Sequence, residues 1–248
     1  MPIVNANGIG LHVQEIGAGP PVVMVHGLLI GSLASWYFTA APALAKDHRV
    51  RVYDLRGHGR SERAKTGYDV RTLATDLAAL TSDLGVVDVV GHSWGALVAL
   101  RFALDHPARV RRLVLVEAPL PPSSTVEMSA FLEADPARWL DALPPQLREA
   151  AESGRRQAKR LIESLGFLIL ESSLLADLRA EPDIDDAELE RLRIPVLLAY
   201  GDRSSCLAAG RRLERVIPGS RLAVLRGGHY LHLDARAELT AELEAHLG

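Results

Sequence analysis

The residues of this chain best placed to do chemistry lie in the pentapeptide Gly91–Gly95, which reads GHSWG. It follows the apolar run Val86–Val90 and precedes the helical pattern Ala96–His106. Between a strand and a helix, a G-x-S-x-G sequence forms a sharp turn that presents the serine hydroxyl above the sheet. The N-terminus of the following helix favours negative charge that develops there. The pattern therefore predicts that Ser93 is a nucleophile.

A serine nucleophile needs a base, and nine histidines are available. His229 lies just past the last predicted strand, in the segment Arg226–His229 (RGGH), where a loop can bring its ring over Ser93. A neutral imidazole can accept the serine proton and return it to the leaving group. His232 is close enough in sequence to remain an alternative.

These residues must be positioned by a layered α/β domain. Short β-branched runs alternate with longer helical patterns such as Asp69–Leu84, which predicts βαβ units and a mainly parallel sheet. Two further pieces, Ile3–Asn5 and Gly10–Glu15, flank Asn7-Gly8 and predict an antiparallel hairpin at one edge. With that hairpin the sheet has about eight strands. The buried strands are predicted at Pro21–Val25, Arg49–Tyr53, Val86–Val90, Leu113–Val116, Val196–Tyr200 and Arg221–Leu225.

A proline-rich segment, Ala118–Pro122, interrupts this alternation, and no strand pattern follows it until Pro195. The sequence therefore predicts a core formed by residues 1–118 and 194–248, with an all-helical lid, residues 119–193, inserted between strands 6 and 7. Apolar lid residues either line an acyl pocket or pack the lid onto the core. A basic face, which either contacts solvent or binds an anionic partner, comprises Arg155, Arg156, Lys159 and Arg160.

Nearly the whole chain resembles the α/β-hydrolase superfamily, and within it the serine esterases and thioesterases. Four features occur in the family's order: His26-Gly27, the loop Asp54–Ser61 (DLRGHGRS), Ser93 in its turn, and Gly228-His229. The resemblance implies an α/β-hydrolase fold. It also implies an oxyanion hole formed by the backbone N–H groups of the residues after His26-Gly27 and after Ser93, which are Leu28 and Trp94.

The acid of the triad is where the sequence departs from the common family pattern. The frame Gly-x-x-Asp after the seventh strand reads Gly201–Ser204 here, so a serine occupies the usual acid position. Glu117 ends the sixth strand, where some lipases and thioesterases of the superfamily carry their acid. Asp202 is the alternative, although it precedes the usual position by two residues. Both keep the chain order Ser, acid, His.

Composition excludes several classes of protein. The formal net charge of −3 gives no positive field for nucleic acid. A single cysteine, Cys206, excludes an internal disulfide and is expected to be a small buried residue. The first residues lack a signal-peptide pattern and no apolar run is long enough for a membrane span, so a cytoplasmic protein is predicted. No cofactor-binding or metal-binding spacing is present along the chain, so neither group is expected.

Together these features predict a serine hydrolase that cleaves a carboxylic ester or thioester through an acyl-enzyme, with Ser93, His229 and Glu117 as catalytic residues. The expected partner is a small-molecule acyl substrate, free or attached to a carrier protein. The displaced acid resembles that of some thioesterases of natural-product biosynthesis. A serine at the turn argues against the epoxide-hydrolase branch, which needs an aspartate. The alternative is a non-hydrolytic member of the fold that binds a ligand or acts as a perhydrolase, lyase or cyclase.

Overall fold

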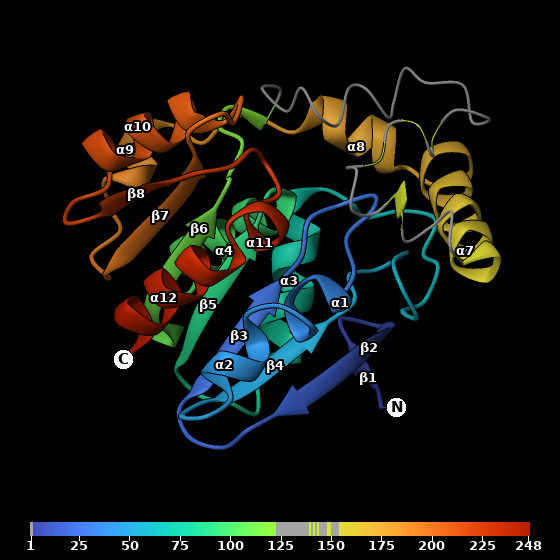
Figure 1. Ribbon diagram of the computed structural model, residues 1–248, viewed down its shortest axis with the longest axis horizontal. Helices are drawn as coiled ribbons and strands as arrows, with labels where there is room; N and C mark the ends of the chain where they lie inside the picture. Colours follow the sequence, from blue (N-terminus) through green and yellow to red (C-terminus); the bar gives the residue numbers. More distant parts are fainter. Residues whose placement is uncertain (1, 123–138, 140, 142, 144–147, 150–153) are drawn as a thin grey trace.

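The computed structural model describes residues 2–122, 139, 141, 143, 148–149 and 154–248. Its centre is an eight-stranded sheet in the order β1-β2-β4-β3-β5-β6-β7-β8 (Figure 1). The β1–β2 and β2–β4 pairs are antiparallel and the other pairs are parallel. This confirms the predicted mainly parallel sheet with a hairpin at one edge. The strands are Ile3–Ala6 (β1), Ile9–Ile16 (β2), Pro21–Val25 (β3), Arg49–Tyr53 (β4), Val87–His92 (β5), Val110–Val116 (β6), Val196–Gly201 (β7) and Arg221–Leu225 (β8).

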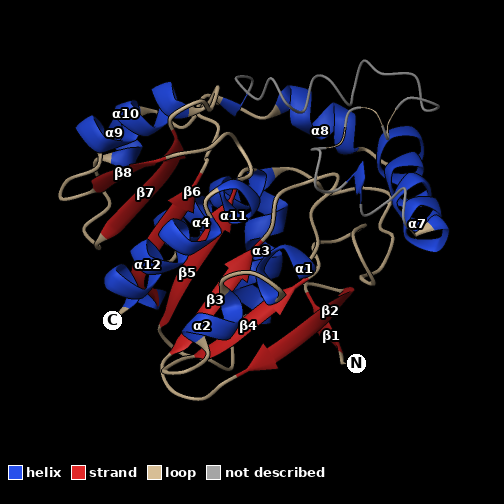
Figure 2. Cartoon of the chain, viewed as in Figure 1, coloured by secondary structure: helices blue, strands red, loops and turns tan. Residues whose placement is uncertain are grey.

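Helices cover both faces of the sheet (Figure 2). Val23 and Val25 of β3 pack into one core with α3 and α4, while Val22 and Met24 pack into a second core with α2 and α12. This alternation is the period of two that a strand buried on both faces requires. The core helices are Ala34–Tyr37 (α1), Ala41–Leu44 (α2), Val70–Leu80 (α3), Trp94–Asp105 (α4), Leu207–Val216 (α10), Leu231–Asp234 (α11) and Arg236–Leu247 (α12), with a 3₁₀ turn, η1, at Pro107–Arg109.

The helix predicted at Asp69–Leu84 is shorter in the structure. Asp69 caps α3 by accepting a hydrogen bond from the Thr72 N–H at 2.8 Å. The helix ends at Leu80, and the chain continues in tighter turns in which the Ser82 N–H bonds to the Ala79 carbonyl and the Leu84 N–H to the Thr81 carbonyl.

Between residues 154 and 193, the described part of the predicted lid consists of short helices joined by loops. Several hydrogen bonds join it to the core; among them, the Tyr68 N–H donates to Asp177 at 2.8 Å, and the Val70 N–H donates to Glu181 at 2.9 Å. Most of residues 123–153 lie outside the described residues, so the domain boundaries at 118/119 and 193/194 stay a prediction. The lid helices are Arg155–Gly166 (α7), the π-helical turn Phe167–Glu171 (η4), Leu174–Ala180 (α8) and Asp186–Leu189 (α9).

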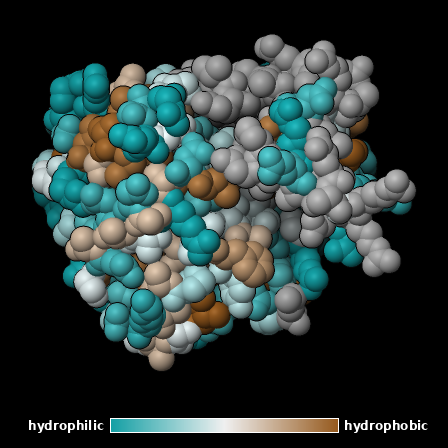
Figure 3. All heavy atoms as spheres, in the orientation of Figure 1, coloured by the Kyte–Doolittle hydropathy of each residue, from teal (hydrophilic) through white to brown (hydrophobic). Residues whose placement is uncertain are grey.

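On the face shown in Figure 3, hydrophobic residues form separate small groups among hydrophilic ones. None of the helices in the described ranges combines the length and hydrophobicity that crossing a bilayer requires.

Candidate active site

Ser93 occupies the turn between β5 and α4 with φ 55° and ψ −124°, a backbone conformation that a non-glycine residue rarely adopts. Its N–H donates to the Val116 carbonyl at 2.8 Å. A Cβ atom on Gly91 would lie 2.3 Å from the Gly95 carbonyl oxygen, and one on Gly95 would lie 2.4 Å from that of His26. Both glycines of the motif are therefore required by close backbone approach, and the strain falls on Ser93.

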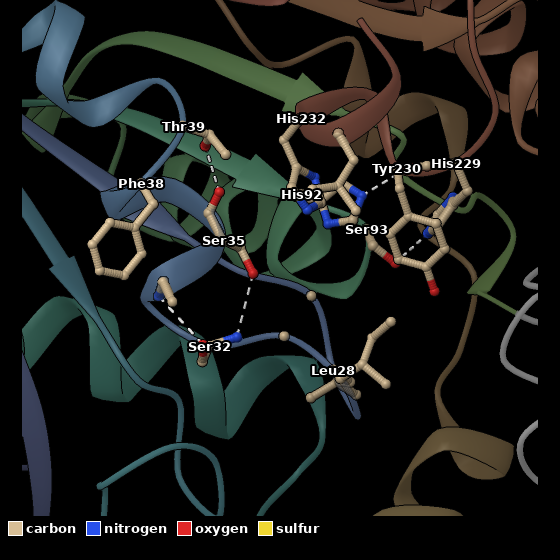
Figure 4. Close-up of a pocket in the computed structure, with 15 residues that line it drawn as sticks. Leu28, Ser32, Ser35, Phe38, Thr39, His92, Ser93, His229, Tyr230 and His232 are labelled. Atoms are coloured by element: carbon tan, nitrogen blue, oxygen red, sulfur yellow. Dashed lines mark hydrogen bonds between the residues drawn. The ribbon is translucent and has the colours of Figure 1, made fainter. Parts of the chain in front are cut away.

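His229 is the histidine that the fold brings to Ser93. Its Nε2 lies 2.9 Å from Ser93 Oγ (Figure 4). The alternative, His232, packs its ring against His92 with centroids 4.9 Å apart, and burial lowers the pKa of His232 to about 4. The structure therefore pairs Ser93 with His229.

Glu117 directly follows β6 and is fully buried, with φ 57°. Its Oε2 lies 3.3 Å from Nδ1 of His229. The carboxylate also accepts hydrogen bonds from the Gly201 N–H at 2.5 Å and from the Ser204 hydroxyl. A buried carboxylate requires such donors, because desolvation otherwise disfavours its charge.

Asp202, the alternative acid, makes a different contact. Its Oδ1 accepts the N–H of Gly227 at 2.9 Å, and the residue is exposed. Asp202 therefore supports the loop that carries His229 and does not bond to the imidazole. Ser204, at the usual acid position of the family, lies against Glu117 instead.

The two backbone positions expected to form an oxyanion hole come from the segment after β3 and from the start of α4. Trp94 is the first residue of α4, where an N–H has no acceptor within the helix. Leu28 follows β3, and the next residue, Leu29, has φ 65°. The Leu29 N–H donates to His58 Nε2 at 2.9 Å, and burial lowers the pKa of His58 to about 3, which keeps it a neutral acceptor. The loop Asp54–Ser61 thus fixes the segment that carries Leu28.

No sequence pattern pointed to a role for His92, which occupies the first variable position of G-x-S-x-G. Its Nε2 lies 2.8 Å from the carbonyl oxygen of His229. Burial, with smaller contributions from His232 and His229, lowers the pKa of His92 well below its usual value. The neutral ring therefore donates through Nε2–H and holds the backbone of the residue that contacts Ser93.

We expect the His92→Phe variant to lower kcat by about tenfold to a hundredfold, because the loss of this donor leaves a buried carbonyl unpaired at a cost of about 1–3 kcal/mol. His92→Gln, whose amide can donate at a similar reach, should restore most of the rate. Steady-state kinetics and thermal unfolding check both variants. A His92→Phe enzyme with unchanged kcat and a lower melting temperature would contradict a positioning role.

After Glu117, Cys206 is the second group that contacts Nδ1 of the His229 imidazole. It is buried, at the start of α10, with Sγ 3.7 Å from Nδ1 of His229. Burial by itself lowers the pKa of His229, but the hydrogen bonds to Cys206 and Glu117 outweigh it and raise that pKa to about 10. The ring therefore holds its second proton to higher pH than an ordinary histidine.

This shift predicts the pH dependence of the reaction. A base works only when unprotonated, so kcat/KM should rise with pH through the neutral range, with an apparent pKa above the usual 6.5. Cys206→Ala removes one of the contacts that raise the pKa and should move this acid limb to lower pH. A pH–rate profile with an acid limb at or below 6.5 would contradict the prediction.

A cavity of about 240 Å³ borders Ser93 and His229. Figure 4 shows Leu28, Phe38 and Tyr230 around it. None of the described lid residues lines this cavity; Leu161 of α7 instead lines a neighbouring cleft of about 840 Å³. Of the apolar lid residues, the core cluster buries Leu165, Phe167 and Leu168. The two spaces adjoin, because both are lined by Ile30, Gly31, Ser32, Ala34 and Phe38.

Comparison with known proteins identifies the class. A family model described as the alpha/beta hydrolase fold matches residues 20–152. The putative carbamate hydrolase RutD of Stutzerimonas stutzeri (strain A1501) is 30% identical over 236 residues, which cover 88% of this chain and 88% of that protein. The chain therefore belongs to the α/β hydrolase fold family, and hydrolases such as RutD are among its relatives.

Two further similarities differ in extent. The soluble epoxide hydrolase of Corynebacterium sp. (strain C12) is 44% identical, but over only 115 residues, which cover 45% of this chain and 39% of that protein. The solved structure of an N-acyl homoserine lactone degrading enzyme has 26% identity and a TM-score of 0.76, and the match covers 98% of this chain and 99% of that one. The epoxide hydrolase is therefore similar to less than half of this chain, whereas the lactone-degrading enzyme has a similar structure over nearly its whole length.

Proposed function

We propose that this protein is a serine hydrolase that cleaves a carboxylic ester or thioester through an acyl-enzyme. The observation that carries the proposal is the continuous contact from Ser93 Oγ to His229 Nε2 at 2.9 Å, and from His229 Nδ1 to Glu117 Oε2 at 3.3 Å. At Ser93, this series of contacts borders a cavity large enough for a small acyl group.

In the proposed reaction, Ser93 Oγ attacks the substrate carbonyl while His229 Nε2 takes the hydroxyl proton. Glu117 stabilises the imidazolium, and the N–H groups of Leu28 and Trp94 stabilise the oxyanion. His229 then protonates the departing alcohol or thiol. Water attacks the acyl-serine with His229 again as base, which releases the acid and restores Ser93.

The sizes of the two spaces suggest how a substrate lies. The cavity beside Ser93, about 240 Å³, suits a short acyl chain, and the adjoining cleft of about 840 Å³ suits a larger leaving group. A thiol carried by a cofactor or a carrier protein is such a group. The similarity to an epoxide hydrolase does not extend to the reaction of that enzyme, because the turn between β5 and α4 carries a serine and not the aspartate which that reaction needs.

Labelling by a fluorophosphonate probe tests the class, with Ser93→Ala as control. We expect one label on each wild-type chain, none on the variant, and hydrolysis that is fastest for short acyl esters or thioesters. Folded wild-type protein that resists the probe would favour the non-hydrolytic binder. Labelling with no hydrolysis in an ester and thioester panel, but with peracid formed when peroxide is supplied, would favour a perhydrolase.

A further inference from the structure

Three side chains that are potential metal ligands, one of them His229, meet on the side of the imidazole that faces away from Ser93. Glu117 comes from the end of β6, Cys206 from the start of α10, and His229 from the loop after β8, so no spacing along the chain reveals the set. All three are buried, with exposed fractions of 0%, 1% and 5%. One ligand atom from each lies within 4.8 Å of the other two.

Two of the three separations within the set are close to those of ligands around one ion. Zn²⁺ binds nitrogen, oxygen and sulfur at about 2.0–2.3 Å, so neighbouring ligands of a tetrahedral site lie about 3.3–3.6 Å apart. Nδ1 of His229 is 3.3 Å from Oε2 of Glu117 and 3.7 Å from Sγ of Cys206. A small shift of side chains would admit the ion, with water as the fourth ligand.

We infer that Glu117, Cys206 and Nδ1 of His229 form an inhibitory binding site for Zn²⁺. A thiolate, an imidazole and a carboxylate are ligands that this cation takes in proteins. The set lies close to solvent, since Ser204, whose hydroxyl donates to Glu117, is partly exposed.

The effect on the enzyme follows from the two nitrogens of the ring. When the ion binds, the thiol proton leaves to solvent and the imidazole keeps one proton, at Nε2. A neutral ring shifts its proton there from Nδ1, and a protonated ring loses its Nδ1 proton to solvent. Nε2 then donates to Ser93 Oγ and no longer accepts its proton. Glu117 is held by the ion as well. Binding therefore removes the base without touching the substrate cavity.

The effect on turnover rests on the proposed function, so one assay follows inhibition. Zn²⁺ is titrated against ester hydrolysis, with each variant normalised to its own metal-free rate. We expect the wild type to lose activity and a chelator to restore it. Cys206→Ser, which keeps the side-chain size but replaces the sulfur, should need at least about tenfold more Zn²⁺, the lower end of what even second-shell changes cost metal sites. Asp202→Asn, a nearby carboxylate outside the set, should respond as the wild type does.

A second assay follows binding without turnover. Cd²⁺, which prefers thiolate, is added to Ser93→Ala protein, and the thiolate-to-cadmium charge-transfer absorption is measured. One equivalent should saturate the signal, and Ser93→Ala combined with Cys206→Ser should give none. Active enzyme with equal Zn²⁺ sensitivity in Cys206→Ser, or no cadmium signal, overturns the site. A cadmium signal in a protein that hydrolyses no ester or thioester instead overturns the proposed function and leaves the metal site standing.

Discussion

Ser93→Ala should lower kcat by a factor on the order of 10⁶, the loss seen when a serine hydrolase loses its nucleophile. The physical reason is that Oγ, 2.9 Å from Nε2 of His229, forms the covalent bond to the acyl group, and a methyl group cannot. Any residual rate, supported by the oxyanion hole and by substrate binding, should be no more than about 10³–10⁴ times the rate of the uncatalysed reaction in water. Steady-state kinetics and intact-mass analysis of the acyl-enzyme check this result.

A second serine supplies the matched control. Ser35 lines the same cavity but contacts the Ser32 N–H, not His229. Ser35→Ala should change kcat/KM by less than about tenfold, since a neutral hydrogen bond is worth about 0.5–1.5 kcal/mol. Both variants should unfold at nearly the wild-type temperature. Wild-type turnover in Ser93→Ala would overturn the assignment of the nucleophile.

Glu117→Gln should lower kcat by about 10⁴, by analogy with the same change of acid to amide in another serine hydrolase triad. The amide oxygen can still accept the Gly201 N–H, but the NH₂ group then faces Nδ1 of His229. A donor there favours the wrong tautomer and cannot stabilise an imidazolium. Thus the shape of the site persists while the electrostatic support is lost.

Asp202→Asn is the comparison that decides the acid. The asparagine oxygen can still accept the Gly227 N–H, so the loop carrying His229 should keep its place. We expect the kcat of Asp202→Asn to stay within about tenfold of the wild-type value, because substitutions at exposed residues usually perturb a protein little. The reverse ranking of the two variants would assign the triad acid to Asp202 and leave Glu117 a structural carboxylate.

Local sequence determined the sheet and the turn at its centre. Three predicted strands, Pro21–Val25, Arg49–Tyr53 and Arg221–Leu225, match β3, β4 and β8 residue for residue. β-Branched runs between turn signals have few other solutions, because they bury both faces of a parallel strand. The strained turn was predictable as well, since Gly91 and Gly95 are the residue type that its close contacts demand.

Tertiary structure alone decided which distant side chains meet. The sequence left Glu117 and Asp202 open as acids, because both follow a strand that ends at the same edge of the sheet. Side-chain direction separated them: Glu117 points at His229, whereas Asp202 points at the backbone of Gly227.

The partners of His229 other than Glu117 were also invisible in the sequence. His92 is 137 residues away along the chain and Cys206 is 23 residues away, and neither separation is a motif. Residue type and local periodicity specify elements and turns, because those depend on near neighbours. Contacts between loop ends depend on strand order and register, and these are settled only when the whole sheet assembles.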